Sequence, residues 1–449
     1  MLLAASLLAA LVVEVTAHGA VAGDDASDST AFRAAIAAAV SGDTIHAGCG
    51  TWDLPRINST TAVLIDARSN LTIDGDGECT VFRMAGGTHT GDYNVFYTRY
   101  SDHITFKDFY LDGNRSNIVS ADEQTHGMVV MDSTYVTIHD VDFAHLYGDG
   151  VKLIANSRAL QHDITVHDVT IDDTGRGGLG FFGSANVLVY NYTATNISDQ
   201  GIDMEPSGVD GLLDVVIRDS YIGAPTQKGA TALSLSGAAG QTETSNVRIE
   251  DTTIMGGIHG VRANNVTLYR VKIVAEYTPA IDFSRNYDNV IIYDCSISSY
   301  GDHNAIHASF VGGDGPSDWL ILDTRITTWK GVALDFEAFD GPLTVSGLHV
   351  NTHIPSTGNG TAILLSNTQA SPNFARVIID DIHIESVKLG VVLSRNISSA
   401  NINDVTIRGD ITLTRSDSIG VTCVNDTGSD IAFTDNLTIT ANTRTSGCL

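Results

Sequence analysis

Short runs of β-branched residues, in which apolar and polar side chains alternate, recur along most of the chain. The clearest copies are Tyr135-Val-Thr-Ile-His-Asp-Val, Asp163-Ile-Thr-Val-His-Asp-Val and Asn186-Val-Leu-Val-Tyr-Asn-Tyr. Each copy is followed by a glycine that leads into a second apolar run, at Gly150, Gly178 and Gly201. Alternation with period two indicates half-buried strands, and a strand–turn–strand unit repeated roughly every 20 to 30 residues is typical of a solenoid.

The three copies align without a gap, and similar openings continue downstream at Val215, Val247, Val266, Val290, Leu320, Leu343, Val377 and Ile402. We therefore predict an all-β protein, a single-stranded right-handed parallel β-helix of about 12 coils stacked at about 4.8 Å per coil. Each coil of a solenoid packs only on its neighbours, so a chain of this length needs no second globular domain. The predicted organisation is an apolar N-terminal segment and cap with a helix at 1–54 and the β-helix at 55–449.

The start of the chain predicts a cap. Leu2–Val13 is an apolar run that is too short to span a bilayer and lacks the basic residues of a secretory signal. We expect it to cover the open end of the solenoid or to dock on a partner, with a degenerate signal peptide as the alternative. An Ala-rich helix is predicted at Ala31–Val40, with Ser29 or Thr30 as its N-cap.

Two stretches resemble known families. Val15-Thr-Ala-His-Gly-Ala-Val-Ala-Gly-Asp-Asp-Ala-Ser-Asp-Ser-Thr-Ala-Phe and the helix after it resemble the N-terminal cap of the pectate-lyase superfamily, which pectin-degrading enzymes and virus tailspikes share. Gly175-Arg-Gly-Gly-Leu-Gly, with the later Gly201-Ile-Asp-Met-Glu-Pro, is similar to a group of β-helix repeat proteins of bacteria and their viruses. The resemblances imply carbohydrate association, and tailspike-type relatives are commonly trimers, which would bury Met1–Val13 between chains. The Arg-Ile-Lys element of polygalacturonases is missing, which argues against ordinary pectin hydrolysis.

The formal net charge of −28 is carried mostly by Asp. Nucleic acid is excluded as a partner, because phosphate binding needs a basic surface. A dense carboxylate surface suits a high-salt environment, where self-repulsion is screened.

The cysteines and sequons favour an extracellular or virion-surface location. Cys49 and Cys79, and likewise Cys423 and Cys448, lie about one coil apart, within the Cα separation that a disulfide allows. Two such disulfides are typical of oxidising compartments, although four small buried hydrophobic residues are the alternative. Cys295 is predicted to be a buried core thiol. Ten sequons are candidate glycosylation sites, although Asn before a strand is also ordinary turn chemistry: Asn58, Asn70, Asn114, Asn191, Asn196, Asn265, Asn359, Asn396, Asn425 and Asn436.

Stacking the three copies brings charged side chains together. The alignment places Arg176 beside Asp199, with Gly177, Gly178 and Gly180 as a shallow floor between charged flanks. We predict a catalytic group of Asp173, Arg176, Asp199, Asp203 and Glu205. We predict a substrate-binding group of His126, Asp149, Lys152 and Gln200. The alternative is that Arg176 and Asp199 form a structural salt bridge and that Asp203 and Glu205 are solvated.

A carboxylate pair beside an arginine suits glycosidic-bond chemistry, in which one carboxyl protonates the leaving oxygen and the other activates water. A lyase would instead need a base for the C5 proton and an Arg or Ca²⁺ for the uronate. The coil between Leu111 and Gly127 is about nine residues longer than its successors and carries Asp112, Asp122 and Glu123, and insertions cluster on the functional face of a solenoid.

No metal site is predicted, since His139 and His167 stack without a third ligand. No cofactor is predicted, except that a lyase would use Ca²⁺. The preferred function is a surface spike that recognises a host or cell-surface polysaccharide, and one version of this hypothesis has the spike depolymerise it as well. The spike is expected to be a homotrimer or part of a larger virion assembly. The alternatives are a secreted polysaccharide lyase or glycoside hydrolase, and a non-catalytic structural surface protein.

Overall fold

The computed structural model describes residues 10–434 except 58–59, 90, 122, 157–158, 207–210, 224, 238–243, 310–316, 338–341, 353–360, 367–375, 386–388, 398–399, 408–409, 417–418 and 424–430. The described chain is nearly all β and forms a parallel β-solenoid of about 11 turns with one α-helix. It divides into two compact units, residues 1–203 with 207–212 and residues 204–206 with 213–449. None of the described helices is long and apolar enough to cross a membrane.

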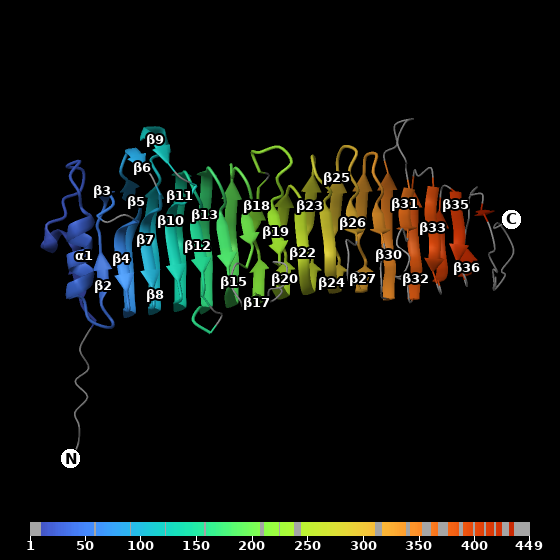
Figure 1. The fold of residues 1–449 in the computed structure, drawn as a ribbon, viewed down its shortest axis with the longest axis horizontal. Helices are drawn as coiled ribbons and strands as arrows, with labels where there is room; N and C mark the ends of the chain where they lie inside the picture. The colour runs from blue at the N-terminus through green and yellow to red at the C-terminus, as the bar shows by residue number, and fades with distance from the viewer. Residues whose placement is uncertain are drawn as a thin grey trace, which may run out of the picture. The chain divides into compact units, whose positions relative to one another are not determined.

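The first unit contains the repeat predicted from the alternating pattern. Strands β11 (Thr134–Leu146), β13 (His162–Thr174) and β15 (Ser184–Thr195) pair in parallel, with Val136 opposite Ile164 and Ile164 opposite Val187. These are the residues that the gap-free alignment predicts to stack. Figure 1 shows these strands side by side in successive coils.

The first unit contains further helices and strands, of which two short strands pair in a separate two-stranded sheet. These elements are η1 (Val15–His18), β3 (Gly50–Leu54), β4 (Thr61–Asp66), β5 (Ser69–Met84), β6 (Gly87–His89), β7 (Tyr93–Arg99), β8 (Asp102–Asp112), η2 (Arg115–Asn117), β9 (Ile118–Ala121), β10 (Thr125–Met131), β12 (Val151–Ile154) and β14 (Leu179–Phe182). The strand β16 (Ile202–Met204) lies at the division between the units.

Sharp bends inside the long strands are made by residues with left-handed backbone. Asp140, Asp168 and Asn191 occupy one such position in successive coils, and His145, Asp173 and Asn196 occupy the next, with φ between +49° and +54°. Asn and Asp adopt this conformation more readily than most other non-glycine residues. Side chains cross between coils at these bends, since the Asn191 amide donates to Asp168 and the Asn196 amide donates to Asp172.

The cap contains the helix α1 (Ser29–Ala38), whose Phe32 packs edge-on against Trp52 and Phe82. The N-cap prediction is wrong. Asp28 is the N-cap residue, and the Ser29 hydroxyl instead donates to the Pro55 carbonyl of the first coil. Of the apolar N-terminal run, Val12–Glu14 forms β1, which pairs in parallel with β2 (Thr44–His46), and residues 1–9 lie outside the described residues.

The second unit repeats the same architecture around an aromatic core. Phe283 stacks on Tyr287, and Trp319 packs edge-on against Phe283 and Phe336. Its strands are β17 (Leu212–Arg218), β18 (Tyr221–Ile222), β19 (Leu233–Ser236), β20 (Thr244–Glu250), β21 (Thr253–Met255), β22 (Ile258–Tyr269), β23 (Lys272–Ala275), β24 (Ile281–Tyr293), β25 (Ser296–Ser299), β26 (Ile306–Ser309), β27 (Ser317–Leu322), β28 (Arg325–Thr328), β29 (Leu334–Glu337), β30 (Pro342–Thr352), β31 (Thr361–Ser366), β32 (Arg376–Glu385), β33 (Leu389–Ile397), β34 (Ala400–Ile407), β35 (Asp410–Ser416), β36 (Ile419–Cys423) and β37 (Ile431–Thr434).

Cys49 and Cys79 form a disulfide with their Cα atoms 4.8 Å apart, and Cys295 is a buried free thiol. The proposed partner of Cys423, Cys448, lies outside the described residues. Among the sequons, Asn58, Asn359, Asn425 and Asn436 also lie outside them. Asn191, Asn196 and Asn265 are exposed, and each donates its amide to a neighbouring coil.

Candidate functional site

Three of the four residues predicted to bind substrate, His126, Asp149 and Lys152, lie in a buried polar cluster in the first unit. The Asp149 backbone N–H donates to His126 Nδ1 at 3.0 Å, and Asp149 Oδ1 accepts from the Gly177 N–H at 2.8 Å. Arg176 Nε lies 3.7 Å from Asp149 Oδ1, while the Lys152 ammonium donates to Gln124 at 2.8 Å. Asp149 is only 3% exposed, so a polymer does not reach its carboxylate in this conformation.

Burial dominates the electrostatics of this cluster. It keeps the pKa of His126 well below 6.5, with Lys152 and Arg176 adding to the effect, so the imidazole is neutral at pH 7. Because Nδ1 accepts the Asp149 N–H, the proton sits on Nε2, which faces the Gln124 side-chain oxygen at 3.1 Å. Burial also raises the pKa of Asp149 and lowers that of Lys152, and their opposite charges partly offset both effects.

The predicted glycine floor is not open. A Cβ on Gly178 would lie 2.2 Å from the Tyr192 hydroxyl, and one on Gly180 would lie 2.7 Å from the Phe182 ring. A Cβ on Gly177 would lie 2.9 Å from Asp149 Oδ1. The glycines are therefore needed because side chains and backbone pack against them, and the space above them is already filled.

The predicted catalytic residues are brought together only in part. The Asp199 N–H donates to the Arg176 carbonyl at 2.9 Å, which confirms that their coils stack, and burial raises the pKa of Asp199 while Arg176 lowers it. Asp203 and Gln200 lie half-buried in the first unit, and Glu205 is exposed and falls in the second unit. Asp173 lies elsewhere, in a hollow beside the long coil.

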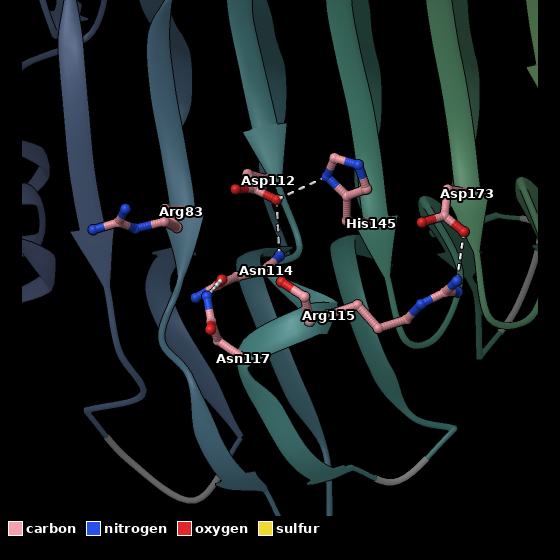
Figure 2. A pocket seen from close by; sticks show the side chains of 8 residues that line it. Arg83, Asp112, Asn114, Arg115, Asn117, His145 and Asp173 are labelled. Atoms are coloured by element: carbon pink, nitrogen blue, oxygen red, sulfur yellow. Dashed lines mark hydrogen bonds and ion pairs between the residues drawn. The ribbon is translucent and has the colours of Figure 1, made fainter.

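This hollow encloses about 580 Å³ and lies beside η2, within the long coil that the sequence singles out. It is lined by Arg83, Asp112, Asn114, Arg115, Ser116, Asn117, His145 and Asp173. Figure 2 shows Asp112, His145 and Asp173 in a row on three neighbouring strands, β8, β11 and β13, with the Arg115 side chain reaching across to Asp173. Asp122, another residue of the long coil, lies outside the described residues.

His145 is the exposed proton acceptor of the hollow. Its side chain is 51% exposed, and Nδ1 lies 3.2 Å from Asp112 Oδ1, which also accepts the Asn114 N–H. With Nδ1–H directed at this carboxylate, Nε2 carries the free lone pair. A carboxylate that fixes the tautomer of an imidazole in this way makes the other nitrogen a competent general base.

Two arginines line the hollow, and each of them is paired with a carboxylate. Arg115 pairs with Asp173 and also donates to the Leu146 carbonyl. Arg83 donates to both carboxylate oxygens of Asp53, a contact that raises the pKa of the guanidinium, and also reaches Asp25. The Tyr110 hydroxyl lies 3.4 Å from His145 Nδ1, and burial together with nearby carboxylates raises its pKa to about 12. A sugar entering the hollow would therefore meet two paired guanidinium groups together with the carboxylates of Asp112 and Asp173.

Sequence reasoning missed most of this hollow. It named Asp173 as catalytic and singled out the long coil with Asp112, but gave His145, Arg115 and Arg83 no role. The available signal was a histidine at a left-handed bend, where its neighbours carry Asp or Asn. Arg83 and Arg115 come from earlier coils of unequal length, so no spacing rule connects them to His145.

The stacked histidines predicted from the openings are present on another face. His139 and His167 stack with ring centroids 4.8 Å apart, and Tyr190 continues the stack at 4.6 Å. Each imidazole also contacts the carboxylate of the next residue, Asp140 or Asp168. The stack is an aromatic ladder in which each imidazole also contacts a carboxylate.

Residues 56–210 match a family model described as "Right handed beta helix region". The chain is similar to the tailspike protein gp49 from Pseudomonas phage LKA1, at 12% identity over 85% of this chain and 82% of that chain, with a TM-score of 0.61. It is also similar to the tailspike gp61 of Pseudomonas phage phi297, at 12% identity over 83% and 80% of the two chains, with a TM-score of 0.56. The A-module of the Azotobacter vinelandii mannuronan C-5 epimerase AlgE6 matches at 15% identity over 96% and 100%, with a TM-score of 0.52.

No curated protein matches the sequence. The family model, over residues 56–210, and the solved structures agree on the fold, which is a right-handed parallel β-helix. Identities this low say nothing about which reaction, if any, the chain performs.

Proposed function

We propose that this protein is a surface β-helix that binds an acidic polysaccharide in the Asp112–His145–Asp173 hollow and cleaves it by elimination. The single observation that carries this proposal is the exposed His145, held by Asp112 beside Arg115 in an open hollow. The known tailspikes and the mannuronan epimerase with the same fold support a polysaccharide as the partner.

In this proposal the arginines bind the uronate carboxylate, and His145 Nε2 takes the proton from C5. The C5 electron pair forms the C4=C5 double bond as the C4–O4 bond breaks, and the leaving oxygen takes up a proton from solvent. Positive charge near the carboxylate stabilises the negative charge that develops when C5 is deprotonated. Hydrolysis is less well supported, because it needs one protonated carboxyl group. Asp112 and Asp173 both accept hydrogen bonds from N–H donors.

The test is incubation of the full chain with a panel of polyuronates and neutral polysaccharides in high salt, which screens the net negative charge. Absorbance at 235 nm reports the unsaturated product of elimination, and reducing ends report either kind of cleavage. We expect His145→Ala to lower kcat by about 10²- to 10⁴-fold and Arg115→Ala to raise mainly KM.

His103→Ala is the matched control. His103 also has left-handed backbone and also pairs with an adjacent carboxylate, Asp102 at 3.0 Å, but it does not line the hollow. Reducing ends without absorbance would replace the lyase by a hydrolase, and binding without product would leave a recognition spike. An equal loss of activity in His103→Ala and His145→Ala, or no binding of any polysaccharide by the wild type, would overturn the assignment of the hollow as the active site.

The proposed setting is the cell exterior or a virion surface, with the chain as a trimer in high salt. Sedimentation of the purified chain at two salt concentrations tests the oligomer. A monomer at both concentrations would contradict the trimer without touching the proposed chemistry.

A further inference from the structure

A second group of chemically competent side chains lies in the second unit, on adjacent strands. His307 of β26 pairs in register with Asp335 of β29, and Glu337 follows two residues later on the same strand. Because side chains alternate across a strand, Asp335 and Glu337 point to the same side. One potential ligand atom from each of the three residues lies within 4.8 Å of the other two.

Asp335 carries an incompletely satisfied buried charge. Its side chain is among the buried polar groups, with the residue 6% exposed. Oδ2 accepts a hydrogen bond from the Asn304 amide at 2.6 Å, but Oδ1 is buried without a hydrogen-bond partner. Burying an unpaired carboxylate oxygen is unfavourable, and buried carboxylates are usually paired with a cation or coordinate a metal. His307 lowers the pKa of Asp335 against the larger effect of burial, but no hydrogen bond reaches Oδ1.

Asp282 fixes the orientation of His307. The Asp282 Oδ1 atom lies 3.0 Å from His307 Nδ1, and its Oδ2 lies 3.5 Å from His259 Nδ1. An imidazole that donates Nδ1–H to a carboxylate presents Nε2 as an unprotonated ligand, which is the arrangement found around most metal-bound histidines. Asp282 is thus a positioning residue, and the three-residue group has the support that metal sites require.

We propose that His307, Asp335 and Glu337 bind a divalent transition-metal ion, with Zn²⁺ as the best match. Two carboxylates and one imidazole suit a borderline metal, whereas Ca²⁺ takes oxygen ligands. Three protein ligands leave one coordination position for water or a substrate oxygen. The His307 side chain is 24% exposed, so that position is open to solvent. The site rests on residues of the second unit alone and does not depend on the proposed function.

The first experiment is calorimetric titration of the full metal-stripped chain with ZnCl₂, with MnCl₂ and CaCl₂ as parallel titrations. We expect one tight Zn²⁺ site per chain, weaker Mn²⁺ binding, and Ca²⁺ binding weaker still. His307→Ala, Asp335→Asn and Glu337→Gln should each weaken Zn²⁺ at least 10-fold, and Asp282→Asn should weaken it by about 10- to 100-fold.

Thermal unfolding gives a second readout that a purely structural role would not produce. Asp335→Asn keeps the shape of the side chain and removes the unpaired charge, so the metal-free variant should unfold at the same temperature as the wild type or higher. Zn²⁺ should raise the unfolding temperature of the wild type and leave this variant unchanged.

The double variant His139→Ala/His167→Ala is the control, since it removes a close pair of imidazoles that lies outside the proposed site. Zn²⁺ affinity unchanged in the His307, Asp335 and Glu337 variants, or lost in the control alone, would overturn the proposal. Failure of the wild type to bind Zn²⁺ at millimolar concentration would do the same.

Discussion

The buried cluster around Asp149 allows a direct test of whether it is structural or catalytic. Asp149→Asn preserves the acceptor for the Gly177 N–H but removes the negative charge that faces Arg176 and Lys152. Lys152 is itself buried, and one guanidinium nitrogen of Arg176 is buried without a hydrogen-bond partner. Removing one partner of a buried charge pair typically costs about 3 to 5 kcal/mol, because the remaining charge is left uncompensated.

An exposed ion pair in the same unit provides a comparison for this loss of stability. Asp173 and Arg115 have side-chain exposures of 33% and 35%, and such pairs contribute only about 0 to 1 kcal/mol. At roughly 2 to 4 °C per kcal/mol, Asp149→Asn should lower the unfolding temperature by about 6 to 20 °C. Asp173→Asn should lower it by at most about 4 °C.

The assay is thermal and urea unfolding of the wild type and both variants, followed by circular dichroism in the same buffer. Activity on any polysaccharide identified as a substrate is measured on the folded fractions. A change below about 1 kcal/mol for Asp149→Asn would refute the structural interpretation. If activity were then lost, Asp149 would return to the substrate-binding role that the sequence predicts.

Three other predictions concern stability. Because burial holds the pKa of His126 well below 6.5, only the unfolded chain takes up a proton at this residue just below pH 6.5. The free energy of unfolding in urea should therefore be steady above about pH 7 and fall by up to about 1.4 kcal/mol per pH unit below about 6.5. His126→Gln should flatten this pH profile, and identical profiles for the variant and the wild type would contradict the assignment. Reducing the Cys49–Cys79 disulfide, which spans 30 residues, should destabilise the first unit by about 3.6 kcal/mol, whereas a Cys49→Ser/Cys79→Ser variant should not respond to reductant. Gly178→Ala should lower the free energy of unfolding in urea by about 1 to 3 kcal/mol, because the new Cβ would lie 2.2 Å from the Tyr192 hydroxyl. Gly48→Ala, whose Cβ would have its nearest contact at 3.5 Å, should be nearly neutral, and equal losses in the two variants would refute the packing argument.

The fold could be predicted because its signal is local and repeated. Alternating β-branched residues set the strands, and a gap-free alignment sets the register, which the Val136, Ile164 and Val187 pairing confirms. The predicted N-cap failed for a tertiary reason. Asp28 has its carboxylate occupied by the Val21 and Asp53 N–H groups, while Ser29 bonds to Pro55, so neither caps the helix through its side chain.

The site was harder to predict, because alignment says which residues stack but not which are buried. The alignment placed Arg176 beside Asp199, whereas its guanidinium also lies 3.7 Å from Asp149, which is only 3% exposed. The hollow depends on Arg115, which lies in an insertion that has no counterpart in the other copies. The metal-site candidates His307 and Asp335 lie on the shorter strands that follow the openings at Val290 and Leu320, and alignment of the openings does not single them out.

The amide bridges at the bends have a consequence for how the protein ages. Asn191 and Asn196 each donate to an aspartate of the preceding coil, Asp168 or Asp172. Slow hydrolysis of either amide would convert a donor into a second carboxylate and place like charges directly opposite each other, which destabilises paired strands. Each such event would loosen the contact between two turns while leaving the covalent chain intact. The rate at which neighbouring turns loosen would then be set by the chemistry of these side-chain amides.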